Sequence, residues 1–147
     1  LRNLIGGPME TTLAIASLIF GGVLDRCPNL TICFCLGGGY APYGVGRFTH
    51  GYNTRPGASS MLHAPEDYLG SFYYDCLTHS PASLRFLMEQ VAADHILLGT
   101  DFPFPGAPTG GAVQWLQGMP FLSGTQRAKI LGGNAASLLG LGAYATE

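Results

Sequence analysis

The stretch His95-Ile96-Leu97-Leu98-Gly99-Thr100-Asp101-Phe102-Pro103-Phe104 decides the fold class of this chain. The continuous apolar run from Ile96 to Leu98 predicts a short parallel strand that is covered on both faces. Asp101 follows where such a strand leaves its sheet, which is the usual place for chemistry in α/β proteins. Pro103 and Pro105 stop the strand and stiffen the loop. A carboxylate held there suits metal ligation or proton transfer, and capping of a following helix is the alternative.

The composition points to one domain with a sizeable apolar core. Of the 147 residues, 47% are hydrophobic and only 11% are charged, with 22 glycines, which suggests buried parallel strands and tight turns, or a chain that packs against more protein. The net charge of −2 with scattered basic residues predicts no nucleic-acid partner. Without an apolar run of roughly 20 residues or a signal peptide, we expect no membrane association and a cytoplasmic location. The four cysteines form no CxxC pair and are predicted to be reduced and buried.

Helical and strand patterns alternate along the chain. Strands are predicted at Leu30–Cys35, Ser71–Cys76 and Ile96–Thr100, with a loop from Pro56 to Pro65. Helices are predicted from Gly7-Pro8 onward, from Ser80-Pro81 onward and over Ala112–Gln117. A further helix is predicted over Gln126–Leu131, preceded by a capping box of Ser123 and Gln126. A break is predicted at Gly132-Gly133-Asn134, followed by a last helical turn over Ala135–Leu139. The helix that begins at Gly7 is apolar nearly all round, so we expect burial on more than one side.

Strands separated by helices in this way form βα units with a parallel sheet. Three parallel strands alone make a poor free-standing domain, because both sheet edges and several helix faces stay uncovered. The pattern therefore favours part of a larger barrel, and a sheet that continues in another copy of the chain is the alternative.

Blocks spaced over essentially the whole chain resemble one protein family. They are Gly7-Pro8-Met9-Glu10-Thr11-Thr12, Gly37-Gly38-Gly39, Gly46-Arg47, Arg55-Pro56, Thr78-His79-Ser80-Pro81 and Gly99 to Phe104. In this order they resemble the later half of the aminocarboxymuconate-semialdehyde decarboxylase family, in the amidohydrolase-2 branch of the metal-dependent amidohydrolases. The resemblance implies an α/β fold, namely a partial (β/α)8 TIM barrel. Residues 1–147 would form a single C-terminal part of it, the last three parallel βα units with a preceding helix.

The same resemblance implies roles for individual residues. Asp101 matches a metal ligand of the family, and Phe104 matches an aromatic side chain of the substrate pocket. Arg47 matches an arginine that binds a substrate carboxylate in a neighbouring subunit's active site. Leu36 stands where active members carry a catalytic histidine, so general acid–base help worth roughly 10²–10⁴-fold would be lost. Asn3 stands where known decarboxylases carry a pocket tryptophan, which predicts a different substrate pocket.

The implied function is a metal-dependent decarboxylase or hydrolase that acts on an unsaturated or aromatic carboxylic acid. Zinc is the expected metal and manganese the alternative, and a homodimer or association with the missing barrel half is expected. The family's histidine ligands fall outside this chain, so we expect little or no activity from it alone. The alternative is a non-catalytic, degenerate relative with a structural or regulatory role.

The residues themselves leave two further interpretations open. His50 and His63 are predicted in loops and His95 at an exposed strand start, whereas His79 could share a cavity with Asp101 and, with Asp75, build a new metal site. Gly37 to Gly39 could cradle an anion on backbone amides in an independent small α/β domain. Close approach to a neighbouring segment is the better account of these glycines.

Overall fold

The computed structural model describes residues 1–55, 57, 61–104, 108 and 110–142. The predicted loop from Pro56 to Pro65 lies partly outside the described residues, as do the predicted stiffening role of Pro105 and the block Arg55-Pro56. The helices are α1 (Gly7–Phe20), α2 (Val23–Arg26), α3 (Ala41–Thr54), α4 (Pro65–Leu69), α5 (Pro81–Val91), α6 (Ala112–Gln117), α7 (Gly124–Ala128) and α8 (Asn134–Leu138). Shorter helical turns are η1 (Arg2–Gly6), η2 (Leu36–Gly38), η3 (Ala93–His95) and η4 (Lys129–Gly133).

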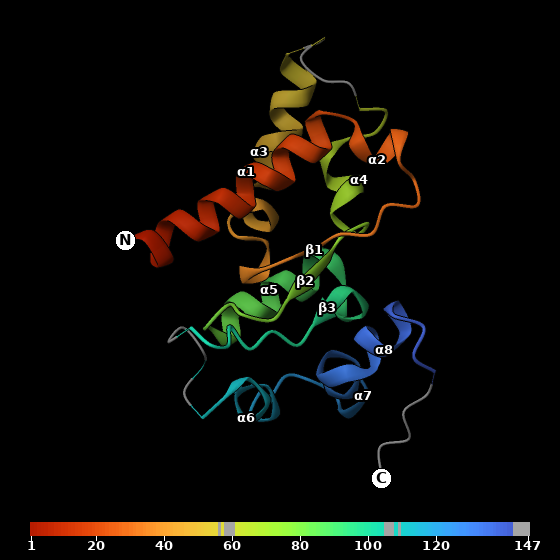
Figure 1. Ribbon diagram of the computed structural model, residues 1–147. Coiled ribbons are helices and arrows are strands. Elements are labelled where there is room, and N and C mark those ends of the chain that lie inside the picture. Colours follow the sequence, from red (N-terminus) through yellow and green to blue (C-terminus); the bar gives the residue numbers. More distant parts are fainter. Residues whose placement is uncertain (56, 58–60, 105–107, 109, 143–147) are drawn as a thin grey trace.

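A three-stranded parallel sheet forms the centre of the described chain, with the order β1 (Cys33–Phe34), β2 (Tyr73–Asp75) and β3 (Ile96–Leu97). Cys33 pairs with Tyr73 and Tyr74 with Ile96. The parallel sheet is as predicted, although each strand is shorter than its predicted range. In Figure 1, α1 to α4 lie on one side of the sheet and α6 to α8 on the other. The closed cylinder of a complete barrel is not formed by these three strands.

Local sequence signals place several helices where they were predicted. Pro8 stands in the first turn of α1, and the Ser80 side chain caps α5 by accepting a hydrogen bond from the Ser83 amide. The capping box of Ser123 and Gln126 is present at α7. The predicted break at Gly132-Gly133-Asn134 is wrong, because the helical path continues through η4 into α8.

The two faces of the sheet differ in burial. Phe34, Tyr74 and Ile96 share one face and are buried under the helices. On the opposite face Cys33 is exposed, whereas Tyr73 and Leu97 are only half-buried. The expectation of strands covered on both faces is therefore wrong for this chain by itself. The expectation of four buried cysteines is wrong too, because Cys27, Cys33 and Cys35 are exposed and only Cys76 is buried.

Helix α1 packs through one face only, which corrects the prediction of burial on several sides. Its buried residues are Thr11, Ile15 and Ile19, whereas Met9 and Leu13 on the same helix are each more than half exposed. By length and composition alone, the helical stretch Arg2–Phe20 could cross a membrane, with mean hydropathy 1.2 and 17% of its apolar window buried. A core helix of a soluble protein meets the same criterion, so the absence of a membrane partner stays a prediction.

Candidate functional site

A cavity of about 760 Å³ opens at the carboxyl ends of the three strands. Its wall combines residues from the turns that follow β1, β2 and β3 with residues from η1 and α1. The lining residues are Arg2, Asn3, Leu4, Gly7, Pro8, Leu36, Gly37, Gly39, Leu77, Thr78, His79, Ser83, Asp101 and Phe104. The carboxyl ends of parallel strands are the place where α/β folds build their sites, so we take this cavity as the candidate active site.

The turn behind each strand places a non-glycine residue in the left-handed backbone region. Leu36 has φ 58°, His79 has φ 54° and Asp101 has φ 56°, and all three line the cavity. Such a backbone costs roughly 1–3 kcal/mol for each residue and concentrates at functional sites. Sequence reasoning did not foresee this shared geometry, because it arises from how three separate turns are packed against one another.

Gly37, Gly38 and Gly39 provide close packing rather than an anion site. A Cβ at Gly37 would lie 2.8 Å from the Thr78 Cγ2 atom, and one at Gly38 would lie 2.8 Å from the Tyr74 ring. The three amides are already used, since Gly37 donates to the Asp75 carboxylate, Gly38 to the Cys35 carbonyl and Gly39 to the Leu36 carbonyl. The predicted close approach is confirmed, whereas the anion cradle is wrong because these amides are engaged within the chain.

Asp75 is buried behind the cavity wall and is saturated with backbone donors. Its carboxylate accepts hydrogen bonds from the amides of Leu36 (2.9 Å), Gly37 (2.8 Å) and Leu77 (3.1 Å). Burial raises its pKa above the ordinary value, while these three hydrogen bonds act in the opposite direction. Asp75 is absent from the cavity lining, so the predicted metal site of Asp101, His79 and Asp75 is not formed.

The structure brings four of the five predicted site residues to this cavity. Asn3, Leu36, Asp101 and Phe104 line its wall. The Asp101 carbonyl accepts a hydrogen bond from the Phe104 amide at 2.7 Å, so the acid begins a tight turn instead of capping a helix. Arg47 lies outside the lining, exposed on α3, a placement that suits contact with another chain and does not test that role.

Arg2 is a lining residue that sequence reasoning missed. It belongs to η1 together with Asn3, and among the described lining residues it is the one permanent cation. No local pattern signalled it, because adjacent residues of a helical turn face different directions and Asn3 does not predict the placement of Arg2. Arg2 therefore joins Arg47 as a candidate for binding a carboxylate.

The histidines are only partly as predicted. His79 lines the cavity with Asp101, as one interpretation proposed. His50 lies in α3 rather than in a loop and is exposed. His95 is half-buried instead of exposed, because its Nδ1 atom lies 3.0 Å from the Phe72 carbonyl and its ring stacks on Tyr73.

The described residues do not by themselves fit a complete metal centre. Asp101 is the one carboxylate and His79 the one imidazole among the described lining residues. Within the described part of the chain, no group of three or more histidine, cysteine, aspartate or glutamate residues could hold a metal ion. A divalent metal in a protein takes three or more protein ligands in its usual sites, so the remaining ligands would have to come from elsewhere.

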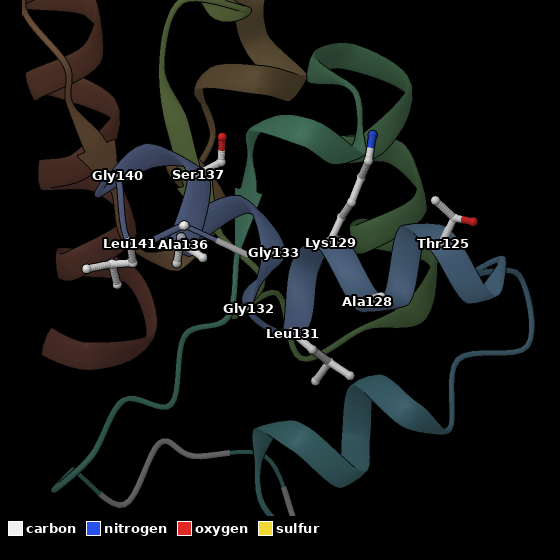
Figure 2. A pocket seen from close by; sticks show the side chains of 12 residues that line it. Thr125, Ala128, Lys129, Leu131, Gly132, Gly133, Ala136, Ser137, Gly140 and Leu141 are labelled. Atoms are coloured by element: carbon white, nitrogen blue, oxygen red, sulfur yellow. The ribbon is translucent and has the colours of Figure 1, made fainter. Parts of the chain in front are cut away.

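A second and larger hollow of about 1220 Å³ lies along α7, η4 and α8 (Figure 2). Small and apolar residues such as Gly132, Gly133 and Ala136 form much of its wall. Lys129 is the one charged residue among those described in its wall. It pairs with the Asp94 carboxylate at 2.7 Å, and Figure 2 shows it pointing away from Leu131. Without a catalytic group in its described wall, this hollow is the weaker candidate despite its size.

The comparisons with known proteins place this chain in a family. The family model described as amidohydrolase matches residues 4–141 of the 147. The chain belongs to this amidohydrolase family. The 2-amino-3-carboxymuconate-6-semialdehyde decarboxylase of Dictyostelium discoideum is 43% identical over 141 residues, which cover 94% of this chain and 39% of that protein. The family predicted from the sequence blocks is thus confirmed.

Two solved structures are similar to this chain in three dimensions. The 5-carboxyvanillate decarboxylase of Sphingomonas paucimobilis matches with a TM-score of 0.79 and 26% identity over 89% of this chain and 40% of that one. A dihydroxybenzoic acid decarboxylase of Polaromonas sp. JS666, with bound manganese and the inhibitor 2-nitroresorcinol, matches with a TM-score of 0.80 and 28% identity over 91% of this chain and 41% of that one. The chain therefore spans about two fifths of the length of the relatives that it matches.

Proposed function

We propose that these 147 residues form one unit, the C-terminal part of an amidohydrolase-family decarboxylase for an aromatic or unsaturated carboxylic acid. The observation that carries the proposal is the convergence of Leu36, His79 and Asp101, one from each strand end, on a single cavity. The relatives described above are decarboxylases, which supports the reaction type. The remaining strands and metal ligands would come from further polypeptide, either a longer chain or a partner.

Five residues have a task in the proposed reaction. Arg2 binds the substrate carboxylate from η1, or Arg47 does so across a dimer interface, because a guanidinium can donate two parallel hydrogen bonds to a carboxylate. Phe104 and Leu36 supply apolar wall against the substrate's ring or chain. Asp101 is assigned to a divalent metal, zinc or manganese, as one ligand of several. A cytoplasmic location and a homodimer stay predictions.

Loss of carbon dioxide leaves an electron pair on the carbon that carried the carboxylate, and this carbon must take up a proton. Leu36 can neither donate nor accept one. Among the described lining residues, His79 is the one imidazole, and histidine is the side chain that most often transfers protons in enzymes. We therefore assign proton delivery in this chain to His79.

The test is a decarboxylation assay with 2,6-dihydroxybenzoate and manganese or zinc, on residues 1–147 alone and on the full-length polypeptide that carries them. We expect little or no carbon dioxide from residues 1–147 and loss of activity from the longer polypeptide when Asp101→Asn is introduced. Unchanged activity of the Asp101→Asn variant would contradict the proposal. Carboxylate binding without turnover by the longer polypeptide would instead favour the non-catalytic relative, which Leu36 makes the second candidate.

Comparing Arg2→Gln with Arg47→Gln separates the two candidates for carboxylate binding. If Arg2 binds the substrate carboxylate, Arg2→Gln raises the dissociation constant for 2,6-dihydroxybenzoate about tenfold or more, because a charge-assisted hydrogen bond is lost. In that case Arg47→Gln leaves the constant unchanged. The reverse result, together with a dependence on dimer concentration, would assign the carboxylate to Arg47.

A further inference from the structure

The buried Asp75 carboxylate connects the ends of two neighbouring strands. It sits at the end of β2 and accepts the amide of Leu77 just beyond it. It also accepts the amides of Leu36 and Gly37, which follow β1. Hydrogen bonds to a charged acceptor are stronger than those between neutral groups, so this carboxylate is a firm link between the two turns.

The end of the third strand passes directly against the same residue. A Cβ built at Gly99 would lie 2.8 Å from the Asp75 Cβ atom and 3.0 Å from the Leu77 Cδ1 atom. Any side chain larger than hydrogen at position 99 would push the segment that leads to Asp101 away from Asp75. Gly99 is therefore the residue that lets the end of β3 come to its place beside the cavity.

The residues that contact Asp75 either line the cavity themselves, as Leu36, Gly37 and Leu77 do, or lie two residues from a lining residue, as Gly99 does. Leu36 has a left-handed backbone conformation, with φ 58°, and its amide donates a hydrogen bond to Asp75. His79 follows Leu77 by two residues, and Asp101 follows Gly99 by two. Asp75 is 8% exposed and absent from the lining, so its side chain contacts no ligand in the cavity. It acts on the cavity through these neighbours and through the repulsion between its charge and that of Asp101.

We propose that Asp75 is a positioning residue, whose hydrogen bonds and close contacts set the places of Leu36, His79 and Asp101 relative to one another. Affinity of the cavity for an aromatic carboxylate then depends on a side chain that touches no ligand. The inference rests on the proposed function only for the ligand used below, because the link between the strand ends can be measured without any ligand.

The first measurement is amide hydrogen exchange on the full-length protein and its Asp75→Asn variant. Asparagine keeps the shape of the side chain but loses the charge and turns an amide group toward the backbone donors. We expect exchange at the Leu36 and Gly37 amides to become about tenfold to a hundredfold faster, with α5 unchanged. Unchanged exchange at both amides would overturn the inference.

The second measurement is binding of 2,6-dihydroxybenzoate, with Asp25→Asn as the matched control. Asp25 is another carboxylate that connects distant segments, because it accepts hydrogen bonds from the Leu62 amide at 2.9 Å and from the Tyr68 hydroxyl. It is absent from the cavity lining. We expect about a tenfold weaker affinity in Asp75→Asn and less than a twofold change in Asp25→Asn. An equal loss in both variants would reduce Asp75 to an ordinary structural residue and overturn the proposal.

The inference stays testable if the protein does not bind the ligand or if the Asp75→Asn variant does not fold. If the unaltered protein binds no 2,6-dihydroxybenzoate, the proposed function loses its ligand, and hydrogen exchange alone decides the role of Asp75. If Asp75→Asn does not fold, Gly99→Ala takes its place, with Gly70→Ala as control because a Cβ at Gly70 meets nothing within 4 Å. Weaker binding in Gly99→Ala alone supports the inference, and equal binding in both variants contradicts it.

Discussion

Replacing Asn134 by alanine should destabilise the protein, because this side chain ties the C-terminal helices to the strand that leads to Asp101. Its Nδ2 atom donates to the carbonyls of Ala93 and Ile96, both at 2.7 Å, and the side chain is 8% exposed. Alanine removes both hydrogen bonds. The Ala93 carbonyl keeps the Ile96 amide as a donor, whereas the Ile96 carbonyl loses the Asn134 donor. At about 1 kcal/mol for each hydrogen bond and a further desolvation cost, the loss comes to about 2–4 kcal/mol.

Urea unfolding with far-ultraviolet circular dichroism measures this loss as a lower midpoint with an unchanged slope. The same loss corresponds to a fall in Tm of roughly 5–15 °C for a chain of this size. Ser137→Ala on the same helix is the control, because Ser137 is exposed and should change the stability by less than about 0.5 kcal/mol. A loss below about 1 kcal/mol for Asn134→Ala would refute the reasoning that these two hydrogen bonds hold β3.

The remaining predictions concern two glycines, one cysteine and one histidine. Gly38→Ala should cost about 2 kcal/mol or more, because φ is +79° and the new Cβ would meet the Tyr74 ring at 2.8 Å. Gly46→Ala, in α3 with nothing within 4 Å, should instead stabilise by roughly 0.5–1 kcal/mol; equal effects in thermal melts would contradict this contrast. Cys33 is exposed at the surface, but neighbouring atoms remove part of the water around its sulfur, and this desolvation, with the Asp75 charge second, raises the pKa of Cys33 to about 11. Its thiolate fraction and its alkylation by iodoacetamide should therefore rise about tenfold per pH unit from pH 8 to 10, and a plateau near pH 9 would disprove it. His79→Asn should lower kcat of the full-length enzyme at least tenfold with KM little changed, whereas an equal kcat would remove His79 from proton delivery.

Much of the candidate site could be predicted because its residues sit in short blocks with local meaning. Asp101 follows an apolar run, and that position alone indicates the end of a parallel strand. The blocks around Leu36 and Phe104 resemble the family closely enough to place both residues in its active site. Arg2 could not be found in this way, because its block carries no recognised role at that position and only the packing of η1 against the strand ends brings it to the cavity.

The corrections have a common physical origin. Helix α1 was predicted to be buried on several sides from its apolar composition, and yet its Met9 and Leu13 are exposed. On the sheet face that carries Cys33 and Tyr73, Cys33 is likewise exposed and Tyr73 is half-buried. An apolar sequence indicates which surfaces are favourable to bury, but it does not indicate whether the residues that bury them belong to the same 147-residue chain.

The order of strands and helices, the caps at Ser80 and Ser123, and the family itself follow from the sequence alone, because each depends on residues close together in the chain. Tertiary structure decided which of these residues meet. It left the amides of Gly37 to Gly39 engaged within the chain, buried Asp75 behind the wall, and brought His79 and Arg2 to the cavity with Asp101. Apart from the Gly38 and Gly39 amides, which bond to carbonyls three residues back, these meetings depend on hydrogen bonds and packing between segments more than 20 residues apart, which no local pattern encodes.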